Sequence, residues 1–184
     1  MLKICFVTSE LAPLAKVGGL ADVSQALPAA LAQLGHDVRV ILPRYRELKT
    51  DSDRQFVNLD NTIALEFGSR AHSFQILETD FPDKDPSSQA PRLFLVDCPE
   101  LFDRTGIYGN QADEHLRFLM LSRGAIEICQ RLKWAPDIFH VNDWQTAMLP
   151  LLLKTVYGWD SLFHSTRSIL TIHNIGHQGI QIVC

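Results

Sequence analysis

Two short apolar runs with an amphipathic stretch between them constrain this fold more than any other feature. Residues 2–8 (LKICFVT) and 37–42 (DVRVIL) are nearly continuous apolar runs, typical of parallel strands buried on both faces. The apolar residues between them recur at steps of three and four: Leu20, Val23, Leu27, Leu31 and Leu34. This spacing predicts one face of a helix that stops at Gly35. Strand, helix and strand in this order predict a right-handed parallel crossover, and therefore an α/β fold.

The rest of the chain alternates in the same way after a strand-rich middle part. We expect this strand-rich insert at about residues 43–110, with β-like pieces at 62–67, 73–78 and 92–96. Further elements are expected in the order helix, strand, helix, strand, at residues 112–134, 138–141, 143–157 and 168–173. In the helix at 112–134 the spacing predicts an apolar face of Phe118, Leu121, Ala125, Ile128 and Leu132. The opposite arc carries Arg117, Glu127 and Arg131. The whole pattern predicts a doubly wound parallel sheet.

Composition and charge exclude several classes of function. A net charge of −4 gives no electrostatic case for binding nucleic acid or an anionic membrane. No apolar run reaches the roughly 18 residues of a membrane helix. The cysteines are scattered, without a C-x-x-C pair: Cys5, Cys98, Cys129 and Cys184. We therefore expect no metal site, and thiols kept reduced in the cytoplasm, or in the plastid stroma if the source is a plant.

Candidate functional residues are expected directly after the predicted strands, because ligands of open parallel sheets bind outside the carboxyl ends of the strands. After the first strand come Glu10 and the segment "KVGG" at residues 16–19. Asp143 follows the strand at 138–141, and His173 with Asn174 ends the last strand. Glycine permits close backbone approach, and a helix start with a lysine attracts phosphate.

Each candidate alone also has a purely structural interpretation. The double glycine matches neither G-x-G-x-x-G nor G-x-x-x-x-G-K-[ST], so its spacing favours a structural turn. Asn142 and Asp143 are typical helix caps, and His173 is typical of a hydrogen-bonded core residue. Together, however, a lysine, carboxylates, a histidine and an asparagine at one edge of a sheet suit a sugar linked to phosphate.

Five motifs in order carry a resemblance to a known family. They are "FVTSELAPLAKVGGLADV", "ALPAALAQLGHDVRVILPRY", "LFDRTGIYG", "DIFHVNDWQTAMLP" and "TIHNIGHQG". Together they cover nearly the whole chain, which resembles the bacterial glycogen synthases and plant starch synthases. The resemblance implies a glucosyltransferase of glycosyltransferase family 5 that extends α-1,4-glucan from ADP-glucose with retention. It also implies a two-lobed GT-B fold, of which residues 1–184 would be an incomplete N-terminal Rossmann-like lobe.

The resemblance further implies roles for individual residues and partners. The diphosphate of the nucleotide sugar would be contacted by Lys16, Gly18 and Gly19. The donor glucose would be surrounded by Asp143 and His173 as catalytic residues, with Asn174 and Tyr108. Two residues would lie toward the acceptor glucan, Glu10 and Asp22. No cofactor and no metal is implied, and ADP-glucose and α-1,4-glucan would be the partners.

Two departures from the family pattern keep alternatives open. Many bacterial members have histidines around the aspartate (H-D-W-H), where this chain has Asn142 and Gln145, so no role is carried to them. The chain also ends after "IQIVC", before the second lobe that the family needs. We therefore expect little synthase activity from these residues alone. The alternative is a non-catalytic truncated product that keeps glucan or partner binding, and a dinucleotide-dependent oxidoreductase is a weaker third. Donor preference for ADP or UDP, and glycogen or starch as product, stay open.

Overall fold

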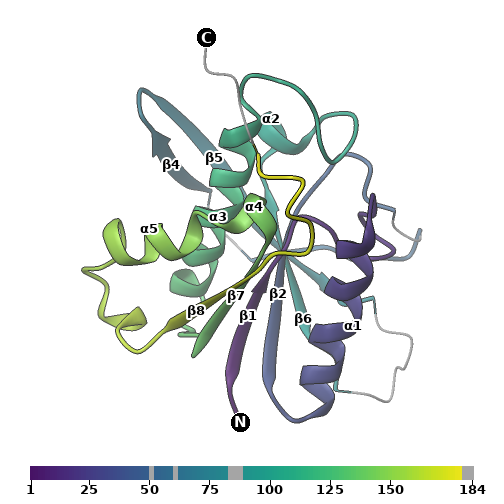
Figure 1. Cartoon of the computed structure of the whole chain (residues 1–184), viewed down its shortest axis with the longest axis vertical. Helices are drawn as coiled ribbons and strands as arrows, with labels where there is room; N and C mark the ends of the chain where they lie inside the picture. The colour runs from purple at the N-terminus through teal and green to yellow at the C-terminus, as the bar shows by residue number, and fades with distance from the viewer. Residues whose placement is uncertain (50–51, 60–61, 83–88, 180–184) are drawn as a thin grey trace.

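The computed structural model describes residues 1–49, 52–59, 62–82 and 89–179. It has an α/β fold around one mixed sheet with the strand order β3-β5-β6-β2-β1-β7-β8, with β4 paired to β5 (Figure 1). The strands β1 (Lys3–Val7), β2 (Asp37–Pro43), β6 (Arg92–Asp97), β7 (Ile138–Asn142) and β8 (Arg167–Thr171) are parallel. The antiparallel strands are β3 (Val57–Asn58), β4 (Ile63–Phe67) and β5 (Arg70–Asp80). The predicted parallel-dominated α/β architecture is confirmed.

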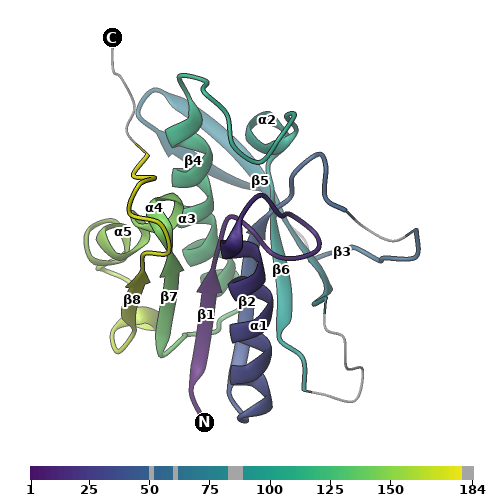
Figure 2. The same cartoon turned by 45° about the vertical axis from the view of Figure 1, so that its right-hand side comes forward.

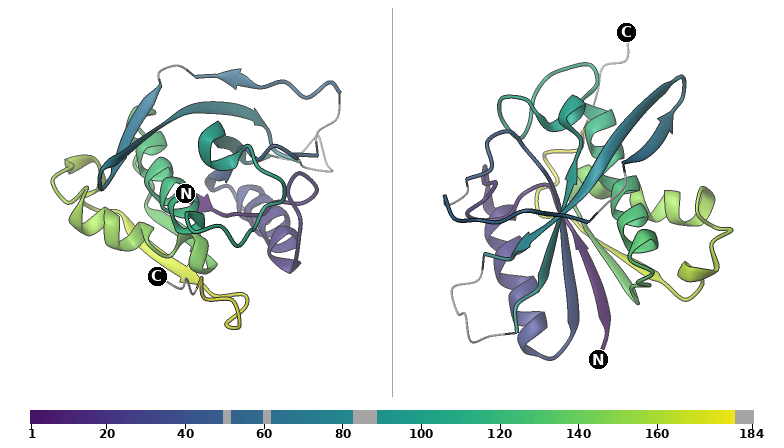
Figure 3. Two further views of the ribbon diagram at one scale, coloured as in Figure 1. Left: turned by 90° about the horizontal axis from the view of Figure 1, so that it is seen from above. Right: turned by 180° about the vertical axis from the view of Figure 1, so that it is seen from behind.

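Helices cover both faces of this sheet. On one face lies α1 (Gly19–Gln33), whose Ser24 shares a hydrogen bond of 2.9 Å with Thr8, the residue that follows β1. On the other face lies α3 (Glu114–Arg131) (Figures 2 and 3). The Cys129 sulfur of α3 is 3.7 Å from that of Cys5 in β1. Shorter helices are α2 (Pro99–Phe102), α4 (Asp143–Thr146), α5 (Leu149–Thr155) and the 3₁₀ turn η1 (Ser161–Phe163). Because successive strand residues face opposite sides, β1 is buried between the two layers.

The buried face of α1 differs from the predicted apolar stripe. Leu20 is buried, but Val23 is 36% and Leu34 is 75% exposed. The residues against the sheet are mostly small: Leu20, Ala21, Ser24, Pro28, Ala29 and Ala32. Small side chains let the helix lie close to the sheet, and Leu27 and Leu31 are only partly buried against the core. The predicted stop is confirmed, since Gly35 has a φ of +86° and its N–H donates to the carbonyl of Ala32.

The middle part of the chain extends the main sheet. β6 pairs in parallel with β2, from Arg39 opposite Arg92 to Pro43 opposite Val96. β5 then pairs with β6 in antiparallel orientation, and the β4–β5 hairpin leans away from the sheet (Figure 1). Residues 92–97 are therefore a buried strand of the main sheet.

Two helix expectations need correction. Residues 143–157 form two helices, because Pro150 has no N–H to donate and interrupts the hydrogen-bond ladder at the start of α5. In α3 the predicted apolar face is buried except for the partly exposed Leu132. The arc opposite this face is partly buried as well, because Arg117 is 1% and Glu127 is 9% exposed. Both have polar partners inside the protein, which a helical periodicity cannot show.

Gly124 is the point where α3 packs most closely on the sheet. A Cβ placed there would lie 3.1 Å and 3.2 Å from the methyl groups of Val96, which is itself fully buried. Overpacking of this kind costs about 1–3 kcal/mol and outweighs the ~1 kcal/mol that alanine gains over glycine in a helix. Gly124→Ala should therefore lower the free energy of unfolding in urea titrations. The matched control is Gly19→Ala, where the new Cβ meets no atom within 4 Å; equal stability of the two variants would contradict the prediction.

Candidate functional site

The candidate site lies at the carboxyl edge of the sheet, where β1, β7 and β8 end side by side (Figure 1). Asn142, the last residue of β7, donates from its side-chain nitrogen to the carbonyl oxygens of Val7 (3.0 Å) and His140 (3.3 Å). Its Oδ1 lies 2.9 Å from Nε2 of His173, which follows β8. Fully buried Asn142 thus joins three strand ends. Sequence reasoning gave this residue no role, although its place after an apolar run pointed to it.

The same contacts fix the proton on the imidazole of His173. The amide nitrogen of Asn142 faces two carbonyl groups, so its oxygen faces the histidine. A carboxamide oxygen only accepts hydrogen bonds, and Nε2 of His173 therefore carries a hydrogen. In the neutral ring Nδ1 is then the nitrogen with a free lone pair. It can accept a hydrogen bond from a hydroxyl group of a ligand.

Asp143 has an unusual backbone and a nearly buried side chain. Its φ is +56°, a left-handed conformation that aspartate tolerates better than most residues, and it is 8% exposed. Its Oδ1 accepts from the backbone N–H of His173 at 2.7 Å and of Asn174 at 3.4 Å. The carboxylate therefore holds the turn after β8 and, contrary to the structural interpretation, makes no side-chain cap of α4. The predicted trio of Asp143, His173 and Asn174 is brought together.

The glycine loop, residues 16–19, is held by hydrogen bonds to the carboxylate of Glu10. Oε2 of Glu10 accepts from the backbone N–H groups of Val17 (2.7 Å) and Gly18 (2.8 Å). Glu10 is only 4% exposed, so its carboxylate is committed to the loop. The space above Gly19 is open, because a Cβ there would meet nothing within 4 Å. A ligand approaching the first turn of α1 would find room at Gly19.

Lys16, the first residue of this loop, forms an ion pair at the surface with Asp22 of α1. The distance from Nζ to Oδ1 is 2.6 Å, and the side chains are 46% and 61% exposed. Exposed ion pairs of this kind contribute about 0–1 kcal/mol to stability. A more highly charged anion can therefore replace Asp22 as the partner of Lys16. Lys16 is therefore available to an anion.

Tyr108 connects the segment before α3 to the first strand. Its hydroxyl donates to Oε1 of Glu10 at 2.7 Å and lies 2.9 Å from Oγ of Ser9, which must then be the donor of that bond. From the end of β2, the hydroxyl of Tyr45 donates to the carbonyl of Ser9 at 3.0 Å. Burial raises the pKa of both phenols, so they stay neutral donors at physiological pH. The predicted residue Tyr108 thus lies against Glu10.

His140 gives the site edge a pH dependence. Partial burial, and secondly the charge of nearby His173, lowers its pKa from the ordinary value of 6.5. His140 therefore binds a proton more tightly in the unfolded chain than in the folded protein. The contribution of neutral His140 to the free energy of unfolding is fully present above pH 6.5 and is lost as the pH falls. His140→Gln should lose less free energy of unfolding than the wild type between about pH 7.5 and about pH 5.5. Urea unfolding at both pH values checks this, and identical losses would contradict it.

The described residues were also searched for metal and membrane features. In residues 1–49, 52–59, 62–82 and 89–179, no group of at least three histidine, cysteine, aspartate or glutamate side chains could hold a metal ion. Over the same ranges no helix is both long and apolar enough to cross a membrane.

Comparison with known proteins gives consistent matches. Residues 3–182 match the family model of the starch synthase catalytic domain. A glycogen synthase of Aeromonas salmonicida (strain A449) is 41% identical over 183 residues, which are 97% of this chain and 36% of that protein. A glycogen synthase of Myxococcus xanthus (strain DK1622) is 41% identical over 182 residues, with the same coverage.

A solved structure is similar as well. The catalytic domain of starch synthase IV from Arabidopsis thaliana, bound to ADP and acarbose, superposes with a TM-score of 0.82 at 33% identity. The match covers 94% of this chain and 34% of that one. The chain thus spans about a third of the length of the relatives that it matches.

Proposed function

This chain belongs to the family of the starch synthase catalytic domain, and on that premise we propose that the protein containing it is a glucosyltransferase. It extends α-1,4-glucan chains, glycogen or starch, from ADP-glucose with retention of configuration. The observation that carries the proposal is the joining of β1, β7 and β8 at one edge through Asn142. The hydrogen bonds of Asn142 hold the imidazole of His173 near the end of β1, the strand that precedes the glycine loop.

The diphosphate of the donor binds at the glycine loop. The N–H groups of Val17 and Gly18 are occupied by Glu10, so the anion is bound instead by Lys16 and the open first turn of α1 at Gly19. Lys16 leaves Asp22 for the phosphate, since a diphosphate carries more charge than one carboxylate. Gly18 contributes by leaving the loop without a side chain.

The glucose of the donor is recognised by the turn after β8. Nδ1 of His173 accepts from a sugar hydroxyl, while Asp143 and Asn174 fix the direction of that turn and supply further polar atoms. Glu10 serves here by holding the loop, and Asp22 remains the exposed carboxylate on the acceptor side. The reaction uses no cofactor and no metal ion, and the protein acts in the cytoplasm, or in the plastid stroma of a plant.

The test is ADP-glucose-dependent elongation of a glucan primer by the complete reading frame that contains these residues. Transfer of labelled glucose with α configuration is expected, and UDP-glucose in a parallel reaction tests the donor preference. The 184-residue chain alone should give no turnover, because Lys16 and Asn174 stand exposed and its site is not closed off from water. If neither protein transfers glucose and the chain still binds glucan, the non-catalytic alternative replaces the proposal.

A further inference from the structure

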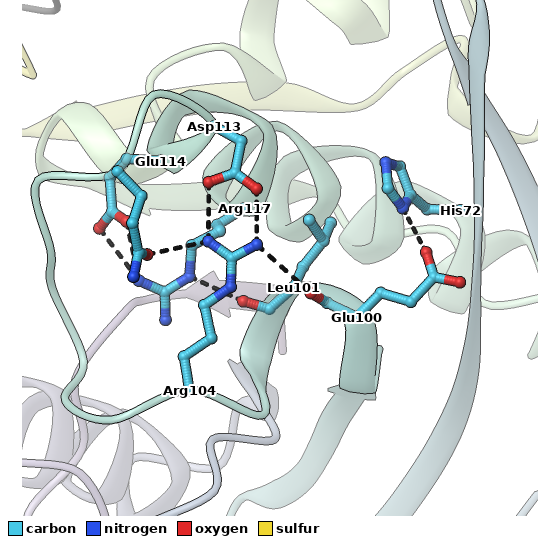
Figure 4. Close-up of polar contacts among 8 residues, drawn as sticks. His72, Glu100, Leu101, Arg104, Asp113, Glu114 and Arg117 are labelled. Atoms are coloured by element: carbon cyan, nitrogen blue, oxygen red, sulfur yellow. Dashed lines mark hydrogen bonds and ion pairs between the residues drawn. The ribbon is translucent and has the colours of Figure 1, made fainter.

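A buried ion pair lies near the candidate site and is not part of it. Glu114 and Arg117, in the first turns of α3, have side chains that are 3% and 1% exposed. Nη1 of Arg117 donates to both carboxylate oxygens of Glu114, at 3.1 Å and 2.9 Å, as Figure 4 shows. Burying two charges costs several kcal/mol, so a pair of this kind is weak evidence for stabilisation alone. Its further contacts indicate what else it does.

The pair holds the tyrosine loop, which we define as residues 103–113. Oε1 of Glu114 accepts from the N–H of Gly109 at 3.1 Å. Nε of Arg117 donates to the carbonyl of Leu101 at 2.8 Å, which anchors the helix before the loop. The two ends of the loop are clamped by Arg104 and Asp113, which form two hydrogen bonds of 2.7 Å and 2.5 Å (Figure 4).

Tyr108 precedes Gly109 in the tyrosine loop, and its side chain connects that loop to the glycine loop through Glu10. Its hydroxyl donates to Glu10, and Glu10 accepts from Val17 and Gly18. Hydrogen bonds, joined by the covalent step from Gly109 to Tyr108, therefore connect the buried pair in α3 to the backbone before α1. Every donor and acceptor in these bonds is a described atom at 2.7–3.1 Å.

We infer that Glu114 and Arg117 are positioning residues that set the conformation of the glycine loop through Tyr108 and Glu10. The pair acts at a distance, because neither Glu114 nor Arg117 makes a hydrogen bond to the glycine loop; Glu114 contacts the tyrosine loop instead. Three aromatic rings lie 5.7–5.9 Å from the guanidinium carbon of Arg117, those of Tyr45, Phe102 and Phe118. Their cation–π contacts restrict the guanidinium, which in turn holds the carboxylate of Glu114 in one orientation. The consequence for catalysis rests on the proposed function, whereas the coupling itself does not.

Amide hydrogen exchange of the 184-residue chain tests the coupling directly. In Glu114→Gln and in Tyr108→Phe, exchange at the N–H groups of Val17 and Gly18 should accelerate about tenfold. Tyr108→Phe removes the donor to Glu10, and Glu114→Gln weakens the contacts that position the segment carrying Tyr108. Tyr108→Phe removes one hydroxyl and keeps the ring, so it remains informative if Glu114→Gln does not fold.

The matched control is Glu127→Gln on the same helix. Glu127 is also nearly buried and accepts from the hydroxyl of Tyr157 at 2.7 Å, away from the loop. It should lose stability without faster exchange at Val17 and Gly18. A rescue variant is Glu10→Gln, whose carboxamide can accept from both N–H groups and donate to Tyr108, and whose exchange should stay slow, unlike that of Glu10→Ala. Unchanged exchange in Glu114→Gln and Tyr108→Phe, or equal acceleration in Glu127→Gln, would overturn the inference.

A second measurement separates this inference from the proposed function. Calorimetric titration with ADP is expected to give weaker binding to Tyr108→Phe than to the wild type, with Glu127→Gln unchanged. If the wild type binds no ADP while the exchange results hold, the proposed function fails and the positioning stands. If ADP binds equally to all variants and the exchange is uniform, the positioning fails and the function stands.

Discussion

Arg117→Met should lower the free energy of unfolding by about 3–5 kcal/mol, because it leaves the Glu114 carboxylate buried without its cation. Oε1 of Glu114 would keep only the N–H of Gly109, and the carbonyl of Leu101 would lose its donor. Urea titration followed by circular dichroism measures the change. Replacing both charges, with Glu114→Gln and Arg117→Met together, should recover part of the loss, since no uncompensated charge remains.

The control for this prediction is an arginine in an exposed pair. Arg46 and Asp103 lie 2.6 Å apart with side chains 52% and 54% exposed, so solvent and salt screen them. Arg46→Met should therefore change the midpoint of unfolding far less than Arg117→Met. Comparable effects of the two substitutions would show that burial does not set the cost of breaking the Glu114 pair.

Lys16→Ala should reduce kcat/KM of the complete reading frame by roughly 100-fold, in line with the loss of one donor that faces developing charge. Lys16 is the cation of the glycine loop, and the N–H groups of Val17 and Gly18 cannot replace it while Glu10 holds them. The initial rate of ADP-glucose-dependent elongation measures the effect.

Two further variants make the result for Lys16 specific. Lys16→Arg keeps a positive charge and should retain most of the activity that Lys16→Ala loses. Lys154→Ala removes an exposed lysine near the end of α5 and should leave the rate unchanged. A loss in Lys154→Ala as large as in Lys16→Ala, or full activity of Lys16→Ala, would remove Lys16 from the proposed phosphate site.

The sequence predicted the parts of the fold that depend on local pattern. The apolar runs at residues 2–8 and 37–42 are β1 and β2, and steps of three and four located α1 and α3. The parallel pairing of β6 with β2 could not be predicted, because nothing within residues 92–97 names the neighbouring strand. The predicted apolar stripe of α1 was only partly right: Leu20 is buried and Leu27 and Leu31 pack partly buried on the core, but Val23 and Leu34 are exposed and small residues fill the rest of the buried face.

The candidate site shows a similar division. Strand ends identified Glu10, Asp143 and His173, since topology alone places such residues at one edge. The sequence could not show that Glu10 meets Tyr108, which lies 98 residues later, nor that Asn142 holds His173. Periodicity placed Arg117 opposite the apolar face of its helix, but it measures hydrophobicity and could not show that Arg117 is buried with Glu114 as its partner. Contacts between distant residues account for each of these differences.

The carboxylate of Glu10 acts on the glycine loop much as a bound anion would. It satisfies two N–H groups that would otherwise be left to water, so the loop keeps one shape before any nucleotide arrives. A ligand then orders little new backbone on binding, and less of its interaction energy is lost to conformational entropy. On the proposed function, ADP should therefore bind with a small entropic penalty.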